Sequence, residues 1–289
     1  MIIVNKNADY SNVAVSVVDV PVIISKLAQE YLDCYVKQLT KKQIVAFDNF
    51  ITTLSAGGVL EKIDRMYLPC LAANTREAYF DVKNKVSVLD ISFTTPTRAY
   101  VNQATSSIHS DSDTSLSAES TMMNIQDSSV NLQNFGIYTL FTRRITFSSN
   151  NTAYIARVNF TSKPLYIKQE LKDTMSFGFT SSGNVYGVKV NHDYNVGDKI
   201  FVSFAINGQK LYGSVNGGDY TQAMLDSSLF PSGIANEAMT GLSPFFGGSI
   251  SQYFFNESDG VLVQIFGKHL TNEENKILCN AMEYLKKAF

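Results

Sequence analysis

Between residues 76 and 267, apolar residues recur mainly at every second position, in short segments separated by turn residues. A period of two places successive side chains on opposite faces of a β-strand. Many short segments at this spacing predict an antiparallel sandwich or barrel rather than alternating strands and helices. The expected strands are residues 76–82, 86–93, 135–147, 152–160, 164–170, 174–180, 184–190, 199–206, 209–215, 248–255 and 261–267.

A polar stretch at residues 102–134 interrupts this alternation, and we expect long surface loops there around one or two short strands. Residues 22–57 follow a helical period instead. A first helix is expected over most of residues 22–39, and its apolar stripe is Ile24, Leu27, Ala28, Tyr31, Cys34 and Tyr35. The short connection to the next helix predicts an antiparallel helical hairpin.

The second helix begins at Thr40, where Thr40 and Gln43 have the spacing of a capping box. Gly57-Gly58 supplies its left-handed stop. Its apolar face is Ile44, Phe47, Phe50, Ile51 and Leu54.

The chain ends in a third predicted helix. Thr271 and Glu274 form another capping box, and Lys286 and Lys287 suit the negative end of the helix dipole. The expected buried stripe is Ile277, Leu278, Ala281, Met282 and Leu285.

These patterns divide the chain into three parts: an extended arm (1–21), a helical hairpin and linker (22–75), and a β-sandwich with its C-terminal helix (76–289). Residues 1–21 alternate loosely between apolar and polar residues and end at Pro21. Two interpretations of this segment stay open: an ordinary edge strand, or an arm that docks on a partner.

Composition excludes several classes of protein. Charged residues make up 17% of the chain and the formal net charge is −2, so no basic face for nucleic acid is expected. Asn, Lys and Asp interrupt the apolar residues among the first 24 positions, so neither a signal peptide nor a membrane anchor is predicted. We therefore expect the chain to be made in a reducing cytoplasm. Cys34, Cys70 and Cys279 lack zinc-site spacing, and we expect them to be buried, reduced and inert.

The segment VGDKIFVSFAINGQKLYGSVNGG (196–218) predicts a β-hairpin that turns at Asn207-Gly208, because Asn and Gly tolerate the positive φ of tight turns. It resembles the central hairpin of concanavalin A-like, laminin-G-like sandwiches, although Lys199-Ile200-Phe201 replaces their usual lead-in aromatic residue. FGIYTLFTRRI (135–145) resembles their early central strand. VLVQIFGKHLTNEENKIL (261–278) resembles their last strand and the helix that follows it.

Residues 25–82 are similar to a helical lead-in that precedes such sandwiches in bacteriophage and prophage structural proteins. The resemblance implies a mainly β fold, an antiparallel two-sheet jelly-roll sandwich with an N-terminal helical hairpin and a C-terminal helix. It also implies a fibre, decoration or receptor-contacting module of a virion, assembled in the cytoplasm of the bacterial host. The partners implied are other virion proteins through the arm, further copies of the chain, and a host surface glycan.

An enzyme is not expected. Some concanavalin-like sandwiches are glycosidases with E-x-D-x-x-E on one strand, but here Glu257-Ser258-Asp259 is followed by Leu262 at the position of the third acid. His109, His192 and His269 lack paired-ligand spacing, and His269 is expected to contact the final helix cap or solvent.

Residues 111–115 (DSDTS) are expected to form a solvated loop, and the alternative is a calcium site, because their alternating carboxylates suit a hard cation. Leu116 stands where a calcium loop needs Gly, and Met122 stands where it needs Glu. No cofactor is therefore predicted, and rim calcium of the kind bound by some laminin-G-like modules stays open.

A sugar site would need an aromatic platform and polar groups beside it. Without Trp in the chain, the ring must come from Tyr or Phe, although Tyr on a sandwich strand is more often packing. Two hypotheses follow: a virion structural protein without turnover, or a carbohydrate-binding module of a bacterial surface protein. The candidate sugar-contacting residues are Tyr186, Tyr194, Tyr212, Asn216, Asp219 and Tyr220.

Overall fold

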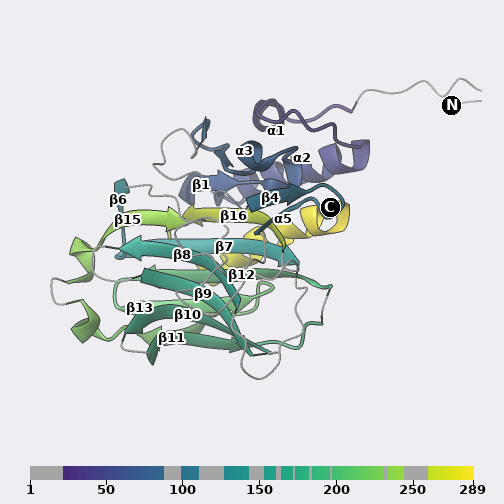
Figure 1. The fold of residues 1–289 in the computed structure, drawn as a ribbon. Coiled ribbons are helices and arrows are strands. Elements are labelled where there is room, and N and C mark those ends of the chain that lie inside the picture. The colour runs from purple at the N-terminus through teal and green to yellow at the C-terminus, as the bar shows by residue number, and fades with distance from the viewer. Residues whose placement is uncertain are drawn as a thin grey trace, which may run out of the picture.

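The computed structural model describes residues 22–87, 99–110, 127–142, 153–160, 164–171, 173–181, 184–195, 197–230, 233–243 and 260–289. Two antiparallel sheets form most of the fold, and helices from both ends of the described chain lie together beside them (Figure 1). The predicted mainly β sandwich with N-terminal helices and a C-terminal helix is confirmed. Among the described residues, no helix is long and apolar enough to cross a membrane.

The larger sheet has ten strands, and β7 lies between β12 and β16. Its main path runs β14 (Thr221–Met224), β13 (Lys210–Val215), β12 (Lys199–Asn207), β7 (Asn134–Thr142), β16 (Gly260–Gly267), β1 (Ile63–Tyr67), β2 (Phe80–Asp81) and β3 (Val86–Ser87). In addition, β5 (Ser107–Ser110) pairs with β16, and β4 (Ala99–Asn102) pairs with β5.

The smaller sheet has six strands and packs on the inner face of the larger one. Phe177 of β10 stacks on Phe204 of β12 with ring centroids 5.4 Å apart. A Cβ added at Gly213 of β13 would lie 2.8 Å from both Phe177 and Val188, so the two sheets meet closely there. The strand order is β11 (Asn184–Asn191), β10 (Thr174–Ser181), β9 (Pro164–Leu171), β8 (Ala153–Phe160), β15 (Ala238–Ser243) and β6 (Asp127–Asn131).

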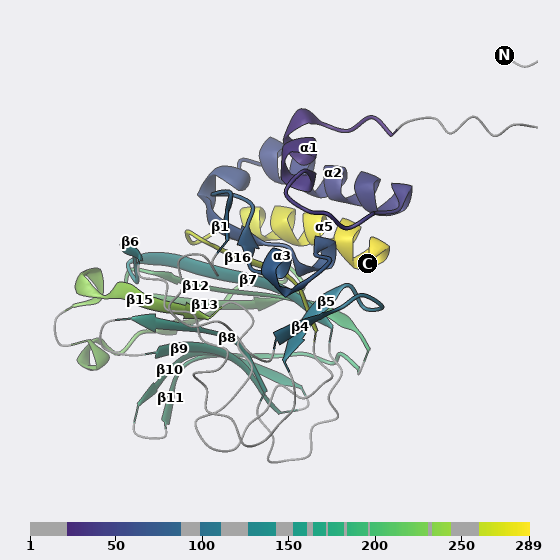
Figure 2. The same ribbon diagram turned by 45° about the horizontal axis from the view of Figure 1, so that its top comes forward.

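Helices cover the outer face of the larger sheet. α5 (Asn272–Ala288) contacts β12 and β13 through Asn275, which hydrogen-bonds to Ser203 and Ser214. α2 (Lys41–Ala56) packs against α5, and α1 (Lys26–Leu32) packs against α2 (Figure 2). The short helices are α3 (Thr75–Ala78) and the 3-10 turns Leu60–Lys62, Pro69–Leu71, Ser227–Leu229 and Ile234–Asn236.

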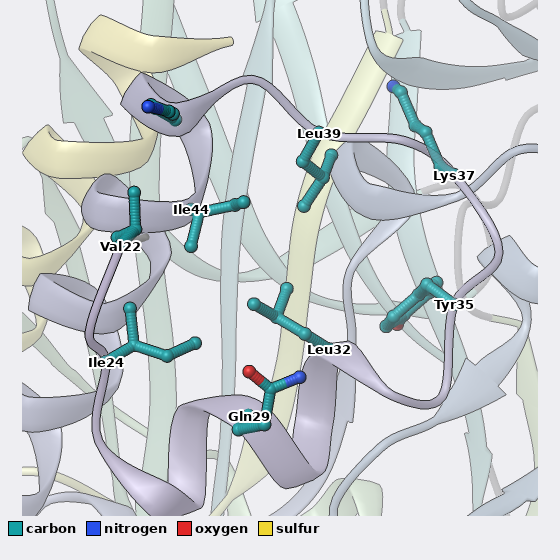
Figure 3. A pocket seen from close by; sticks show the side chains of 9 residues that line it. Val22, Ile24, Gln29, Leu32, Tyr35, Lys37, Leu39 and Ile44 are labelled. Atoms are coloured by element: carbon teal, nitrogen blue, oxygen red, sulfur yellow. The ribbon is translucent and has the colours of Figure 1, made fainter. Parts of the chain in front are cut away.

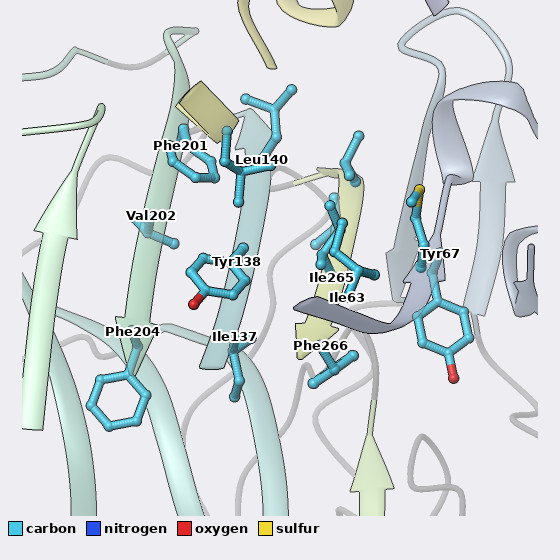
Figure 4. Close-up of a cluster of buried hydrophobic side chains, with 14 of the residues drawn as sticks. Ile63, Tyr67, Ile137, Tyr138, Leu140, Phe201, Val202, Phe204, Ile265 and Phe266 are labelled. Atoms are coloured by element: carbon cyan, nitrogen blue, oxygen red, sulfur yellow. The ribbon is translucent and has the colours of Figure 1, made fainter. Parts of the chain in front are cut away.

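The core strands are buried on both faces because sheet and helices enclose them. Every residue from Phe135 to Thr142 on β7 is buried, as is every residue from Ile200 to Ile206 on β12. Figure 4 shows Tyr138 and Leu140 on β7 between β12 and β16, whose Phe204 and Ile265 belong to the same cluster. A strand that is covered on both sides carries a continuous apolar run rather than strict alternation.

Both predicted capping boxes are present, at Thr40–Gln43 and at Thr271–Glu274. The left-handed stop after α2 is also confirmed, at Gly58, which has φ +68°. The first helix is shorter than predicted, because α1 ends at Leu32 and residues 35–40 are not helical. From there the Tyr35 side chain is buried in the core, and Lys37 Nζ donates to the Cys70 carbonyl oxygen at 3.2 Å.

The strand predicted at 76–82 is wrong over its first half, where α3 lies. Asn74 accepts a hydrogen bond from Glu77 N–H at 3.0 Å, and Glu77 accepts one from Ala73 N–H at 2.8 Å. This local capping outweighs the weak alternation of the segment. Strands β1, β4, β14 and β15 were not predicted, and β1 lies inside the segment 22–75 that was expected to be only helix and linker.

The hairpin of β12 and β13 is confirmed, but its turn is one residue later than predicted. Asn207 pairs with Lys210, so Gly208 and Gln209 are the central residues. Gly208 has φ +61°, and a positive φ at only the first central position is typical of a type II′ turn. The second Asn-Gly, residues 216–217, has positive φ at both positions and is the next turn, as expected.

The cysteines are free, but Cys34 is only half-buried, contrary to the prediction that all three are buried. It lies in the turn that ends α1 rather than on a continuing helix. Burial raises the pKa of the Cys70 thiol to about 12 and that of Cys279 to about 11, so both thiols stay protonated and unreactive near neutral pH. The arm 1–21, the calcium candidate 111–115, the acids 257–259 and the strand 248–255 lie outside the described residues.

Candidate functional site

The structure brings two of the predicted sugar-contacting residues, Tyr212 and Tyr220, into contact, and adds His269 as a third ring. The ring centroids of Tyr212 and Tyr220 are 5.6 Å apart, with planes at 72°. His269 lies 4.4 Å from the Tyr212 ring and 5.9 Å from the Tyr220 ring. Hereafter these three residues are the aromatic cluster.

Each ring of the aromatic cluster comes from a different element, and all three meet near the beginning of α5. Tyr212 lies on β13, on the face that also carries Ser214 toward α5. Tyr220 follows the Asn216-Gly217 turn, and its N–H donates to Asn272 Oδ1 at 3.1 Å. His269 lies between β16 and α5, and its N–H donates to Asn134 Oδ1 at 2.8 Å.

The aromatic cluster is half-buried, and burial affects the protonation of Tyr220 and His269. Burial raises the pKa of the Tyr220 hydroxyl far above its ordinary value. Burial and the nearby Lys62 ammonium lower the pKa of His269, although Glu274 opposes this. The imidazole is therefore uncharged near neutral pH, and it packs as an aromatic ring rather than as a cation.

An exposed ion pair joins Asp219, the residue before Tyr220 in the chain, to Lys276 on α5. Lys276 Nζ is 2.9 Å from the Asp219 carboxylate, and the two side chains are 53% and 75% exposed. The hydrogen bond from Lys276 to Asp219 raises the pKa of the lysine. The pair offers both donors and acceptors to a ligand at little cost, because an exposed ion pair contributes little to stability.

Asn216 has a structural role in the turn before the aromatic cluster. Its N–H donates to the Phe201 carbonyl oxygen at 2.7 Å, and its Oδ1 accepts from Phe201 N–H at 2.8 Å. Its carboxamide oxygen is thus engaged by the backbone of β12. Contact between Asn216 and a sugar stays a prediction, and the geometry accounts for this residue without one.

The other two predicted residues are not part of the aromatic cluster. Tyr194 stacks on His192 in the loop after β11, with ring centroids 5.5 Å apart and planes at 23°. Tyr186 lies on β11, and its side chain lies outside the described part of the structure. His269 was expected to contact the final helix cap or solvent, because nothing in the local sequence places it beside Tyr212.

No group of three or more His, Cys, Asp or Glu side chains within the described ranges could hold a metal ion. The buried carboxylate of Asp81 is engaged by the fold. It accepts from Met66 N–H at 3.1 Å and from Asn84 Nδ2 at 2.6 Å, and it lies 3.6 Å from Arg65. Burial raises the pKa of Asp81 in spite of these partners. These contacts give Asp81 a structural role in joining β1 and β2.

An open groove lies in the helical layer, between α1, α2 and the segment that joins them (Figure 3). Its volume is about 340 Å³. Leu32 and Ile44 project into it from opposite sides, and Gln29 lies at one end. We call this feature the helical groove. It is lined by Val22, Ile24, Gln29, Leu32, Tyr35, Lys37, Leu39, Lys41 and Ile44.

No family model matches the chain, and no curated protein matches its sequence. Similar solved structures include the binding domain of botulinum neurotoxin serotype D, with 11% identity and a TM-score of 0.42 over 55% of this chain and 40% of that chain. Another is the serotype D/C VPI 5993 binding domain, with 11% identity and a TM-score of 0.41 over 52% of this chain and 37% of that chain.

A third similar structure is botulinum neurotoxin type C, which depends on interaction with two ganglioside molecules to enter cells. It shares 12% identity and a TM-score of 0.41 over 56% of this chain and 39% of that chain. This chain therefore spans about two fifths of the proteins it resembles. Sequence identities and TM-scores this low do not assign a ligand or a partner to this chain.

Proposed function

We propose that this chain is a non-catalytic structural protein of a bacteriophage particle whose sandwich contacts carbohydrate on the host surface. The observation that carries the carbohydrate part is the half-exposed Tyr212 ring, braced by Tyr220 and His269. The apolar face of a sugar stacks on such a ring, and polar groups at its side provide hydrogen bonds. Asp219 and Lys276 supply these polar groups.

The virion part of the proposal rests on sequence. The segment 25–82 resembles a helical lead-in of bacteriophage and prophage structural proteins, and the hairpin 196–218 resembles the concanavalin A-like sandwiches that follow such lead-ins. In this proposal the chain is made in the host cytoplasm and is built into the particle as a fibre or decoration component. The alternative is a carbohydrate-binding module on a bacterial surface. Co-purification of the chain with phage particles supports the first, and its presence only in a bacterial envelope supports the second.

A glycan array with the full chain tests the carbohydrate part. We expect Tyr212→Ala to weaken binding about fivefold, since stacking on one ring contributes about 1 kcal/mol. Tyr284→Ala is the matched control, because Tyr284 is an exposed tyrosine on α5 outside the aromatic cluster. Absence of binding by the wild-type chain to every glycan on the array would remove this part of the proposal.

The same preparation tests the absence of catalysis. Incubation with capsular and cell-wall polysaccharides should release no new reducing ends over the background of buffer. Release that persists in repeated preparations and scales with protein concentration would show that the chain is an enzyme.

A further inference from the structure

The helical groove is an apolar surface without an occupant among the described residues. Its walls are formed by Val22, Ile24, Leu32, Leu39 and Ile44, from three consecutive segments of the chain. At about 340 Å³ it has the size of a site that holds a few side chains. A groove of this composition gains free energy when apolar side chains displace water from it.

The same three segments also expose apolar side chains beside the helical groove. Of the described residues, five large apolar side chains are exposed, and three of them belong to these segments: Ile23 at 92%, Val36 at 77% and Val45 at 44%. Single exposed apolar residues are ordinary, whereas a concentration of them around an apolar groove marks an interaction surface. Residues 22–45 therefore carry exposed apolar side chains in addition to the apolar lining of the groove.

Residues 1–21 provide an occupant of suitable chemistry. In the segment Val13–Val20 (VAVSVVDV), six of the eight residues are apolar and five of these are valines, which favour extended backbone. Val13, Val15 and Val17 would lie on one face of an extended chain. We call residues 13–20 the valine segment.

The charges of the two surfaces are complementary. Lys37 and Lys41 are the charged residues of the groove lining, and both are cationic. The valine segment carries one acidic residue, Asp19, and no basic residue. An extended valine segment therefore matches the groove in both polarity and charge.

The connection between the valine segment and the groove favours a groove on another copy. Val22 and Ile24 already line the groove, so the same chain would have to reverse direction just before Val22. The position before a proline, here Val20, favours extended backbone, and residues 13–22 contain no Gly or Asn to supply the positive φ of the tightest turns. Fully extended, the nine residues 13–21 reach about 30 Å from Val22, beyond the radius of gyration of about 19 Å expected for a chain of this length.

We propose that the helical groove of one copy receives the valine segment of a second copy of this chain, so that copies associate by exchange of their arms. Reciprocal exchange of this kind gives a symmetric dimer, and sequential exchange gives a ring or a filament. Each contact buries apolar residues of the valine segment against Leu32, Leu39 and Ile44. The interaction is independent of carbohydrate binding, since the aromatic cluster lies on other elements.

Light scattering coupled to size exclusion tests the proposal on the full chain. One chain has a mass of 32.0 kDa, and we expect the wild type to elute with at least twice this mass. A double substitution in the arm, Val15→Asp with Val17→Asp, should return the mass to that of one chain. Leu39→Lys in the groove should do the same.

Matched controls separate the proposed contact from general effects of charge. Ser16→Asp adds a charge to the opposite face of the valine segment, and Met224→Lys adds one at an apolar position that is 67% exposed on β14. Both should keep the wild-type mass. The arm variant changes only residues outside the described fold, so it keeps the test valid even if Leu39→Lys fails to fold.

Mixing the arm variant with Leu39→Lys pairs an intact groove with an intact valine segment, and it should restore a species of two chains. A wild type that elutes as one chain would overturn the proposal. If the arm variant then lowers the melting temperature, the groove holds the arm of its own chain. If it does not, the arm does not occupy the groove. An oligomer that survives both variants would also overturn the proposal.

Discussion

Tyr138 is the residue that ties the centre of the larger sheet to the helical layer. Its hydroxyl donates to the Lys268 carbonyl oxygen at 2.7 Å and accepts from Leu270 N–H at 3.0 Å. Both partners lie in the short connection from β16 to α5. Burial raises the pKa of Tyr138 well above its ordinary value, so the hydroxyl keeps the proton that it donates.

Replacement of this hydroxyl should be costly. We expect Tyr138→Phe to lower the free energy of unfolding by about 1–3 kcal/mol, because the Leu270 N–H and the Lys268 carbonyl lose a buried partner. Urea unfolding measures the change, and Tyr284→Phe is the control, since its hydroxyl is on an exposed ring. Equal stability of the two variants would contradict this role for Tyr138.

His269 should make stability depend on pH. Burial and Lys62 lower its pKa below 6.5, so the folded protein binds this proton less readily than the unfolded chain does. As the pH falls through 6.5, the unfolded chain takes up the proton first and the free energy of unfolding decreases. We expect His269→Gln to reduce this decrease between about pH 7.5 and about pH 5.5, measured by urea unfolding. An unchanged decrease would contradict the expectation.

At the scale of elements, the Asn216-Gly217 turn after β13 packs against α5. Gly217 has φ +69°, and a Cβ added to it would lie 2.7 Å from the Cys279 Cβ. Gly208, at the tip of the hairpin, has a similar φ of +61°, but an added Cβ there would meet nothing within 4 Å. Both glycines have a positive φ that disfavours a residue with a Cβ, and only Gly217 also lacks room for one.

This pair of glycines separates backbone strain from packing. Gly208→Ala should lower the free energy of unfolding by about 1 kcal/mol, the cost of a left-handed conformation for a residue with a Cβ. Gly217→Ala should lower it by about 2–4 kcal/mol, because overpacking against Cys279 adds to this cost. Chemical unfolding of both variants measures the difference. Equal losses would show that α5 moves away from the turn at little cost.

At the scale of the whole molecule, the segment 22–75 shares a core with the sandwich. β1 pairs with β16 over Ile63–Tyr67, and Tyr67 packs edge-on against Phe266 at 6.0 Å. α2 contributes Phe47, Phe50 and Leu54 to the same hydrophobic cluster as α5. Without this segment β16 would have an open edge for part of its length, and α5 would expose its outer side.

We therefore expect a fragment of residues 76–289 to be insoluble or to lack cooperative unfolding, because it exposes apolar surface and the edge of β16. A fragment of residues 22–289 should unfold cooperatively within a few degrees of the full chain. Circular dichroism during heating compares the two. A soluble, cooperatively unfolding 76–289 fragment would show that the division of the chain at residue 75 is a true domain boundary.

Local sequence patterns were sufficient to predict helix starts and tight turns, because neighbouring residues determine both. The capping boxes at Thr40 and Thr271 define helix starts, because each side chain bonds a backbone N–H within the same turn. The central hairpin followed from alternation and from Asn and Gly between two apolar runs. Two local signals conflict at α3. Asn74 and Glu77 have the spacing of a helix cap, whereas the apolar alternation of residues 76–82 favours a strand.

Contacts between distant segments decided the rest. The end of α1 at Leu32 depends on the burial of Tyr35 in a core that distant segments complete, and the strand β1 depends on pairing with β16, which lies far from it in sequence. The aromatic cluster unites β13, the loop after it and the entrance to α5, so no single stretch of sequence carries it. Sequence alone therefore determined the fold class, most of the central strands and the helix starts. The tertiary structure decided which side chains share a surface, because burial depends on what the rest of the chain brings to the same place.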